Sequence, residues 1–146
     1  MGEAEDLAHR RRGDLRARRG SATGDELARI EREYDRLRAA TDLADRSRVD
    51  DLLAWLHADG FAVNHEVNAA LGADATRFAE EGDLAERAAT LRVPALVVHG
   101  AVDPRPARFA ARVAELIPGA ELAVMPNVGH YPRFEAPGEF NELVRG

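Results

Sequence analysis

Two short apolar runs in the second part of this 146-residue chain constrain its fold more than any other feature. Residues 96–98 and 122–125 are continuously apolar, which is typical of strands in a parallel sheet covered on both faces. Apolar residues at helical spacing lie between them, over residues 106–118, and again after Pro137. Because a strand, a helix and a parallel strand form a right-handed crossover, we expect a β-α-β-α unit with two parallel strands over residues 92–146.

The first 91 residues have a different periodicity. Apolar residues recur there every three or four positions, with no strand-like alternation, so we expect a helical region. Asp25 and Ser47 precede two of the apolar stripes and are predicted to cap the helices there. The four stripes are Leu27, Ile30, Tyr34, Leu37 and Thr41; Val49, Leu52, Leu53 and Leu56; Val67, Leu71, Ala75 and Phe78; and Leu84, Ala88 and Leu91.

Each expected strand ends in a turn that carries an acid–base side chain. Asp103 follows the first strand, and His130 follows the second directly after Gly129, where glycine allows a sharp turn. A catalytic triad needs its acid at a rigid strand end, because that acid holds the imidazole in one tautomer and stabilises its cation. Taken alone, Asp103 before Pro104 is also typical of a turn residue, and His130 of a surface loop. Their joint context favours a triad acid and a triad histidine.

The nucleophile that such a pair would serve is not in this sequence. No Gly-x-Ser-x-Gly motif occurs, and the only serines, Ser21 and Ser47, follow charged residues instead of an apolar strand. An aspartate nucleophile would need the same turn, and Asp74 lies in a helical stretch. The oxyanion loop that would precede the nucleophile is also missing. We therefore expect the chain to be inactive alone, since losing a triad nucleophile removes most of the catalysis.

The motifs resemble those in the second half of a proline-iminopeptidase-like α/β-hydrolase, in which the triad acid precedes the histidine. Phe-Ala-Val-Asn-His-Glu-Val-Asn-Ala-Ala-Leu at 61–71 is similar to a cap motif of that group. Residues 83–106 resemble its cap-to-core junction and acid turn, and residues 129–137 its histidine loop. The resemblance implies a truncated α/β-hydrolase, with residues 1–91 as the helical cap (lid) and residues 92–146 as the C-terminal part of the core.

The same resemblance suggests one substrate contact. In iminopeptidases, cap glutamates bind the free α-amine of the substrate, and Glu66 stands in the matching motif. It is therefore an expected substrate-binding residue, and the alternative is a carboxylate on a helix surface.

Composition excludes several classes of protein. There is no cysteine, which excludes disulfides and thiolate metal sites and suits a cytoplasmic protein. No run of about 18 apolar residues and no secretory signal is present, so we expect no membrane partner. The histidines lack metal-ligand spacing and no phosphate-binding glycine loop occurs, so no metal or cofactor is expected.

Positive charge is concentrated near the N-terminus, although the net charge is −6. Residues 9–19 contain six arginines but no aromatic residue that would stack on a base. A solvated helix face is therefore favoured over a nucleic-acid arm, with Asp14 and the earlier residues Glu3, Glu5 and Asp6 as counter-charges.

Three functions remain open. The first is a portion of a serine hydrolase, aminopeptidase- or esterase-like, that acts on a small peptide, amide or ester once another half completes it. That half would be a separate chain, a segment encoded upstream of an incorrectly assigned start, or a part that has been lost. The second is a non-catalytic helical interaction module. The third is an arginine-rich nucleic-acid binder, which would show steeply salt-dependent binding to DNA.

Overall fold

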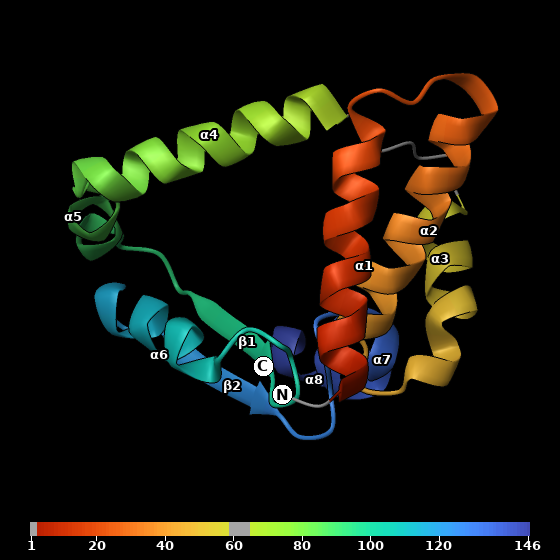
Figure 1. Cartoon of the computed structure of the whole chain (residues 1–146). Coiled ribbons are helices and arrows are strands. Elements are labelled where there is room, and N and C mark those ends of the chain that lie inside the picture. The colour runs from red at the N-terminus through yellow and green to blue at the C-terminus, as the bar shows by residue number, and fades with distance from the viewer. Residues whose placement is uncertain (1–2, 59–64) are drawn as a thin grey trace.

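The computed structural model of this chain describes residues 3–58 and 65–146. The described part is mostly helical and has one two-stranded parallel sheet, which is compatible with a truncated α/β fold (Figure 1). The elements are α1 (Glu3–Arg19), α2 (Gly24–Asp42), the 3-10 turn η1 (Arg46–Arg48), α3 (Val49–His57), α4 (His65–Glu81), α5 (Asp83–Thr90), β1 (Leu96–Gly100), α6 (Ala107–Leu116), β2 (Glu121–Met125), α7 (Pro132–Glu135) and α8 (Pro137–Arg145).

The predicted β-α-β unit is confirmed. β1 and β2 run parallel, with Leu96 opposite Glu121 and Gly100 opposite Met125, and α6 connects them and packs against both. The sheet is less covered than its continuous apolar runs predicted, because Leu122 and Val124 remain more than 40% exposed. Each strand has one neighbour in this sheet, so each also has an open edge.

The buried core lies where the helical region meets the segment that follows β2. Ala39, Leu43, Val49 and Leu52, from the end of α2 through α3, form a buried cluster. Tyr131 and Phe134, from the start of α7, pack against it together with Leu53 and Leu56. This packing fixes the segment between β2 and α7 against the end of α2.

α1 and α2 lie side by side, and this arrangement pairs part of the arginine run with acidic residues (Figure 1). Arg11 and Arg18 of α1 pair with Glu33 and Glu26 of α2 at 2.7 and 3.1 Å. Arg19 pairs with Glu31 in the same way. The arginines lie on a helix, as expected, and these three take counter-charges from α2. The side chains of the expected partners Glu3, Glu5 and Asp6 lie outside the described residues. Such exposed pairs contribute little stability each.

Two predicted helix caps are wrong. α2 begins at Gly24, so Asp25 lies inside its first turn, and its N-cap Thr23 makes no side-chain cap. Asp45, not Ser47, makes the cap that precedes α3, because its carboxylate accepts hydrogen bonds from the backbone N–H and hydroxyl of Ser47. A short side chain two residues before a free N–H reaches that N–H more directly than the side chain of the residue that carries it.

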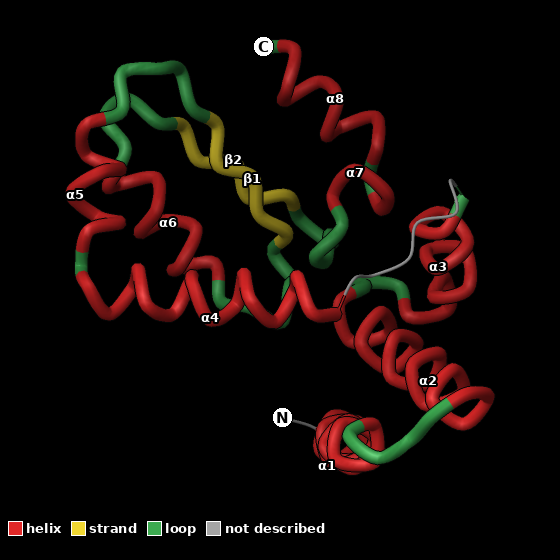
Figure 2. Tube along the Cα trace, turned by 90° about the horizontal axis from the view of Figure 1, so that it is seen from above, coloured by secondary structure: helices red, strands yellow, loops and turns green. Residues whose placement is uncertain are grey.

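The apolar stripe of α4 is exposed instead of buried. Val67 and Leu71 are 51% and 63% exposed, and Phe78 is only half-buried. α4 leads from the α1–α3 helices towards α5, which contacts α6 (Figure 2). The sequence thus has the periodicity of a buried helix, but Val67 and Leu71 are exposed among the described residues.

Candidate active site

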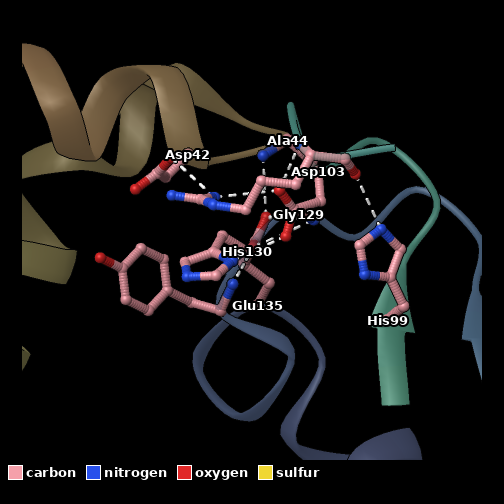
Figure 3. Close-up of polar contacts among 9 residues, drawn as sticks. Asp42, Ala44, His99, Asp103, Gly129, His130 and Glu135 are labelled. Atoms are coloured by element: carbon pink, nitrogen blue, oxygen red, sulfur yellow. Dashed lines mark hydrogen bonds and ion pairs between the residues drawn. The ribbon is translucent and has the colours of Figure 1, made fainter. Parts of the chain in front are cut away.

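The two turns that follow the strands bring Asp103 and His130 together. Because β1 and β2 are parallel, their carboxyl ends lie side by side and the turns are neighbours. His130 Nδ1 and Asp103 Oδ2 are 2.7 Å apart (Figure 3). The Asp103 side chain is 4% exposed and that of His130 is 40% exposed. A buried carboxylate thus faces one edge of an imidazole that remains open to solvent.

The contact defines the tautomer of His130. A carboxylate only accepts hydrogen bonds, so the neutral ring must carry its proton on Nδ1 to make this bond. Nε2 is then left as an acceptor, which is the state required of a general base.

The first turn is held to the second by backbone hydrogen bonds. Ala101 N–H donates to the Met125 carbonyl at 2.8 Å, and Val102 N–H donates to the Val128 carbonyl at 3.0 Å. Gly100 is buried at this crossing, and a Cβ there would collide with the carbonyls of Val128 and Gly129. Only glycine therefore lets the two turns approach closely enough for the pair to form.

The histidine loop is held by a carboxylate that the sequence analysis assigned no role. Glu135 of α7 accepts hydrogen bonds from the backbone N–H groups of Gly129, Tyr131 and Ala44, at 2.8–3.1 Å. It lies in the Glu-Ala-Pro segment of the histidine-loop motif, but nothing local to that motif indicates the link to Ala44. This carboxylate joins the loop to the segment after α2.

Arg105 holds the second oxygen of Asp103. Its backbone N–H and its Nη1 donate to Asp103 Oδ1 at 2.8 and 3.0 Å, and the same Nη1 reaches Asp42 Oδ1 at 3.1 Å. Burial, the largest single influence, would raise the pKa of Asp103. Hydrogen bonds from the Arg105 backbone, from His130 and from the Arg105 side chain outweigh it, so the pKa of Asp103 lies below its ordinary value. Asp103 is therefore a carboxylate at neutral pH.

An open depression of about 300 Å3 lies beside the pair, on the β1 side of the sheet. Its lining includes Asp103 and His130, together with Phe109 and Val113 of α6. His99 of β1 also lines it, and its Nε2 lies 3.0 Å from the Arg105 carbonyl (Figure 3). Since a carbonyl only accepts, the neutral ring of His99 carries its proton on Nε2, the opposite tautomer to His130.

The other sequence-predicted residues lie elsewhere. Glu66 is exposed in the first turn of α4 and is not among the residues that line this depression. The hydroxyls of Ser21 and Ser47 bond to the Arg18 carbonyl and to Asp45, respectively. The geometry therefore unites the predicted acid and histidine without Glu66 or either serine.

Two features are absent from the described part of the chain. No group of three or more His, Asp or Glu side chains there is arranged to hold a metal ion. No helix in residues 3–58 and 65–146 combines the length and apolarity needed to cross a membrane.

No protein-family model matches this chain, and no curated protein matches it significantly. A solved structure of an N-acyl homoserine lactone degrading enzyme is similar to part of it, with 42% sequence identity and a TM-score of 0.41. The match covers 43% of this chain and 25% of that enzyme's chain. The proline-iminopeptidase resemblance stays a prediction.

Proposed function

We propose that this chain supplies the acid and the histidine of a serine-type hydrolase acting on a small peptide, amide or ester. The observation that carries the proposal is the 2.7 Å contact between His130 Nδ1 and the buried Asp103 carboxylate, at the ends of two parallel strands. Asp103 orients the ring, and His130 Nε2 takes the proton of a nucleophile and returns it to the leaving group. An aminopeptidase-like activity, with Glu66 as the contact for a substrate amine, is the narrower form of this proposal.

The nucleophile comes from a polypeptide segment other than residues 3–58 and 65–146. The depression beside the pair is lined by β1 and not by β2, so it lies at the open edge of β1. Phe109 and Val113, which wall it, are 58% and 46% exposed. An open strand edge beside exposed apolar side chains is a template for another strand and the helix that accompanies it. A segment docked there would bring its nucleophile to His130.

The test of the pair is the protonation pattern of its imidazole, measured by nitrogen-15 NMR on the full chain. We expect neutral His130 to carry its proton on Nδ1 and His99 to carry its proton on Nε2, which makes His99 an internal control. Asp103→Asn should remove the preference of His130 and leave that of His99 unchanged. A wild-type His130 ring protonated mainly on Nε2 would contradict the proposal.

The chain alone should not hydrolyse substrates. We expect no turnover of an activated ester or a proline arylamide by the purified protein above that of the His130→Ala variant. Turnover by the wild type that disappears in His130→Ala would show that a nucleophile is present within the chain.

A non-catalytic interaction module is the second candidate, and the exposed stripe on α4 favours it. Val67, Leu71 and Leu84 of α5 are each more than half exposed, which is unusual for apolar residues at regular helical spacing. A protein that binds a partner through this stripe should lose binding on Leu71→Asp and keep it on Asp103→Asn. The catalytic proposal predicts the opposite for hydrolysis by the completed enzyme: Asp103→Asn should reduce hydrolysis, and Leu71→Asp should leave it unchanged.

A further inference from the structure

Asp42, the last residue of α2, bonds directly to His130 and is linked to Asp103 through Arg105 (Figure 3). Its backbone carbonyl accepts the N–H of His130 at 2.7 Å. Its carboxylate accepts from Arg105 Nη1 at 3.1 Å, and that nitrogen also donates to Asp103 at 3.0 Å. Asp42 is 3% exposed. Acidic residues are almost never buried to this extent unless they are paired.

The Asp42 carboxylate constrains where Arg105 can donate. A buried carboxylate is costly unless it is paired and hydrogen-bonded, so Asp42 holds the guanidinium in the gap between the two acids. The guanidinium in turn holds Asp103 Oδ1, together with the Arg105 backbone N–H. With Oδ1 fixed from that side, Oδ2 is directed at His130 Nδ1.

The carbonyl of Asp42 acts on the other member of the pair. It lies so close to the histidine loop that a Cβ on Gly129 would collide with it and with the N–H of Ala44. Ala44 donates that N–H to Glu135, which also holds the loop. The segment after α2 therefore sets the backbone position of His130 as well as the orientation of its acid.

We propose that Asp42 is a positioning residue for the Asp103–His130 pair, acting through Arg105 on the acid and through its own carbonyl on the histidine loop. The inference rests on the proposed function. It places control of the pair in the helical region, so that a shift of the end of α2 changes the alignment of the imidazole.

The test compares the exchange of the His130 Nδ1 proton with water in the full-length wild type and in three variants. Asp42→Ala should make this proton exchange about tenfold faster, as expected for weakening a charge-assisted hydrogen bond, and should raise the share of rings protonated on Nε2. Asp42→Asn should restore most of the protection, because its amide oxygen still accepts from Arg105. Arg36→Gln removes an exposed ion pair between α2 and Asp50 and should change nothing at His130.

The outcomes separate this inference from the proposed function. A folded Asp42→Ala protein with wild-type proton exchange and tautomer would overturn the inference and leave the pair intact. A wild type without a protected Nδ1 proton would overturn the proposed function, and the inference with it. If Asp42→Ala does not fold, Arg105→Gln removes the guanidinium that forms the same bridge and should give the same faster exchange.

Discussion

The residues that carry the site are held by close backbone approach as much as by side-chain chemistry. Gly100 and Gly129 lie where the two turns and the end of α2 meet, and a Cβ at either position would collide with backbone atoms. A backbone atom cannot move aside as the end of a flexible side chain can. The pair therefore depends on two residues that have no functional group.

Gly129→Ala should destabilise the fold and disrupt the pair. Inserting a methyl group into a closed contact costs about 1–3 kcal/mol, and here the neighbours are the Asp42 carbonyl and the Ala44 N–H. The free energy of unfolding, measured by urea denaturation, should fall by that amount. Gly138→Ala is the matched control: it lies in α8 with open space at its Cβ and should be neutral or stabilising. Equal stability of the two variants would contradict the close approach.

Acid should weaken the fold through Asp103. Its folded-state pKa is lowered, so its contribution to stability is present above the unfolded-state value of about 4 and is lost as the pH falls through the lower folded-state value. Between about pH 5 and pH 2, the unfolding free energy of the wild type should therefore decline more steeply than that of Asp103→Asn. Parallel declines would show that Asp103 is not stabilised as an anion in the folded chain.

At the scale of elements, the short helix α7 acts as the anchor of the histidine loop. Its Glu135 accepts hydrogen bonds from three backbone N–H groups in two parts of the chain. Its Phe134 packs on the core formed by α2 and α3. Arg48 also lies over the Phe134 ring, 4.4 Å from its centroid. The loop is thus tied to the helical region through polar and apolar contacts on the same element.

Glu135→Gln should loosen this anchor. A glutamine offers one acceptor oxygen where the carboxylate offers two, so at least one of the N–H groups of Gly129, Tyr131 and Ala44 loses its partner. We expect a loss of about 1.5–3 kcal/mol in unfolding free energy, the range for hydrogen bonds to a charged group, with faster hydrogen exchange at these three amides. Glu139→Gln on the exposed face of α8 should leave both measurements unchanged.

The elements differ in how far the sequence predicts them. The strands and the turns with Asp103 and His130 are encoded by contiguous apolar runs and turn residues, so local pattern is enough to place them. The bridge from Asp42 through Arg105 joins residues 63 positions apart, and no periodicity marks either of them. The predicted helix caps are wrong for a related reason. Several polar residues lie near each helix start, and the folded geometry decides which of them bonds to a free N–H.

At the scale of the whole molecule, the buried core cluster and most of the exposed apolar residues lie in different elements of the described chain. The core is formed by α2, α3 and the start of α7, whereas the sheet and α6 keep several large apolar residues exposed. The pair lies between the two, held by the core and open towards the uncovered edge of β1. A molecule built this way positions a histidine firmly and leaves the space in front of it for another polypeptide.

That uncovered surface should make the chain self-associate. Phe109 and Val113 stand on one face of α6, both about half exposed, beside an open strand edge, and such patches bind other apolar surfaces. Sedimentation velocity should show wild-type association that increases with concentration, and Phe109→Ser with Val113→Ser should abolish it. The unfolding free energy should change by less than about 0.5 kcal/mol, because exposed positions contribute little to the core. Arg112→Ser is the control, because Arg112 is an exposed polar residue of the same helix. This variant should associate like the wild type. A wild type that stays monomeric at every concentration would show that this face does not act as a docking surface by itself.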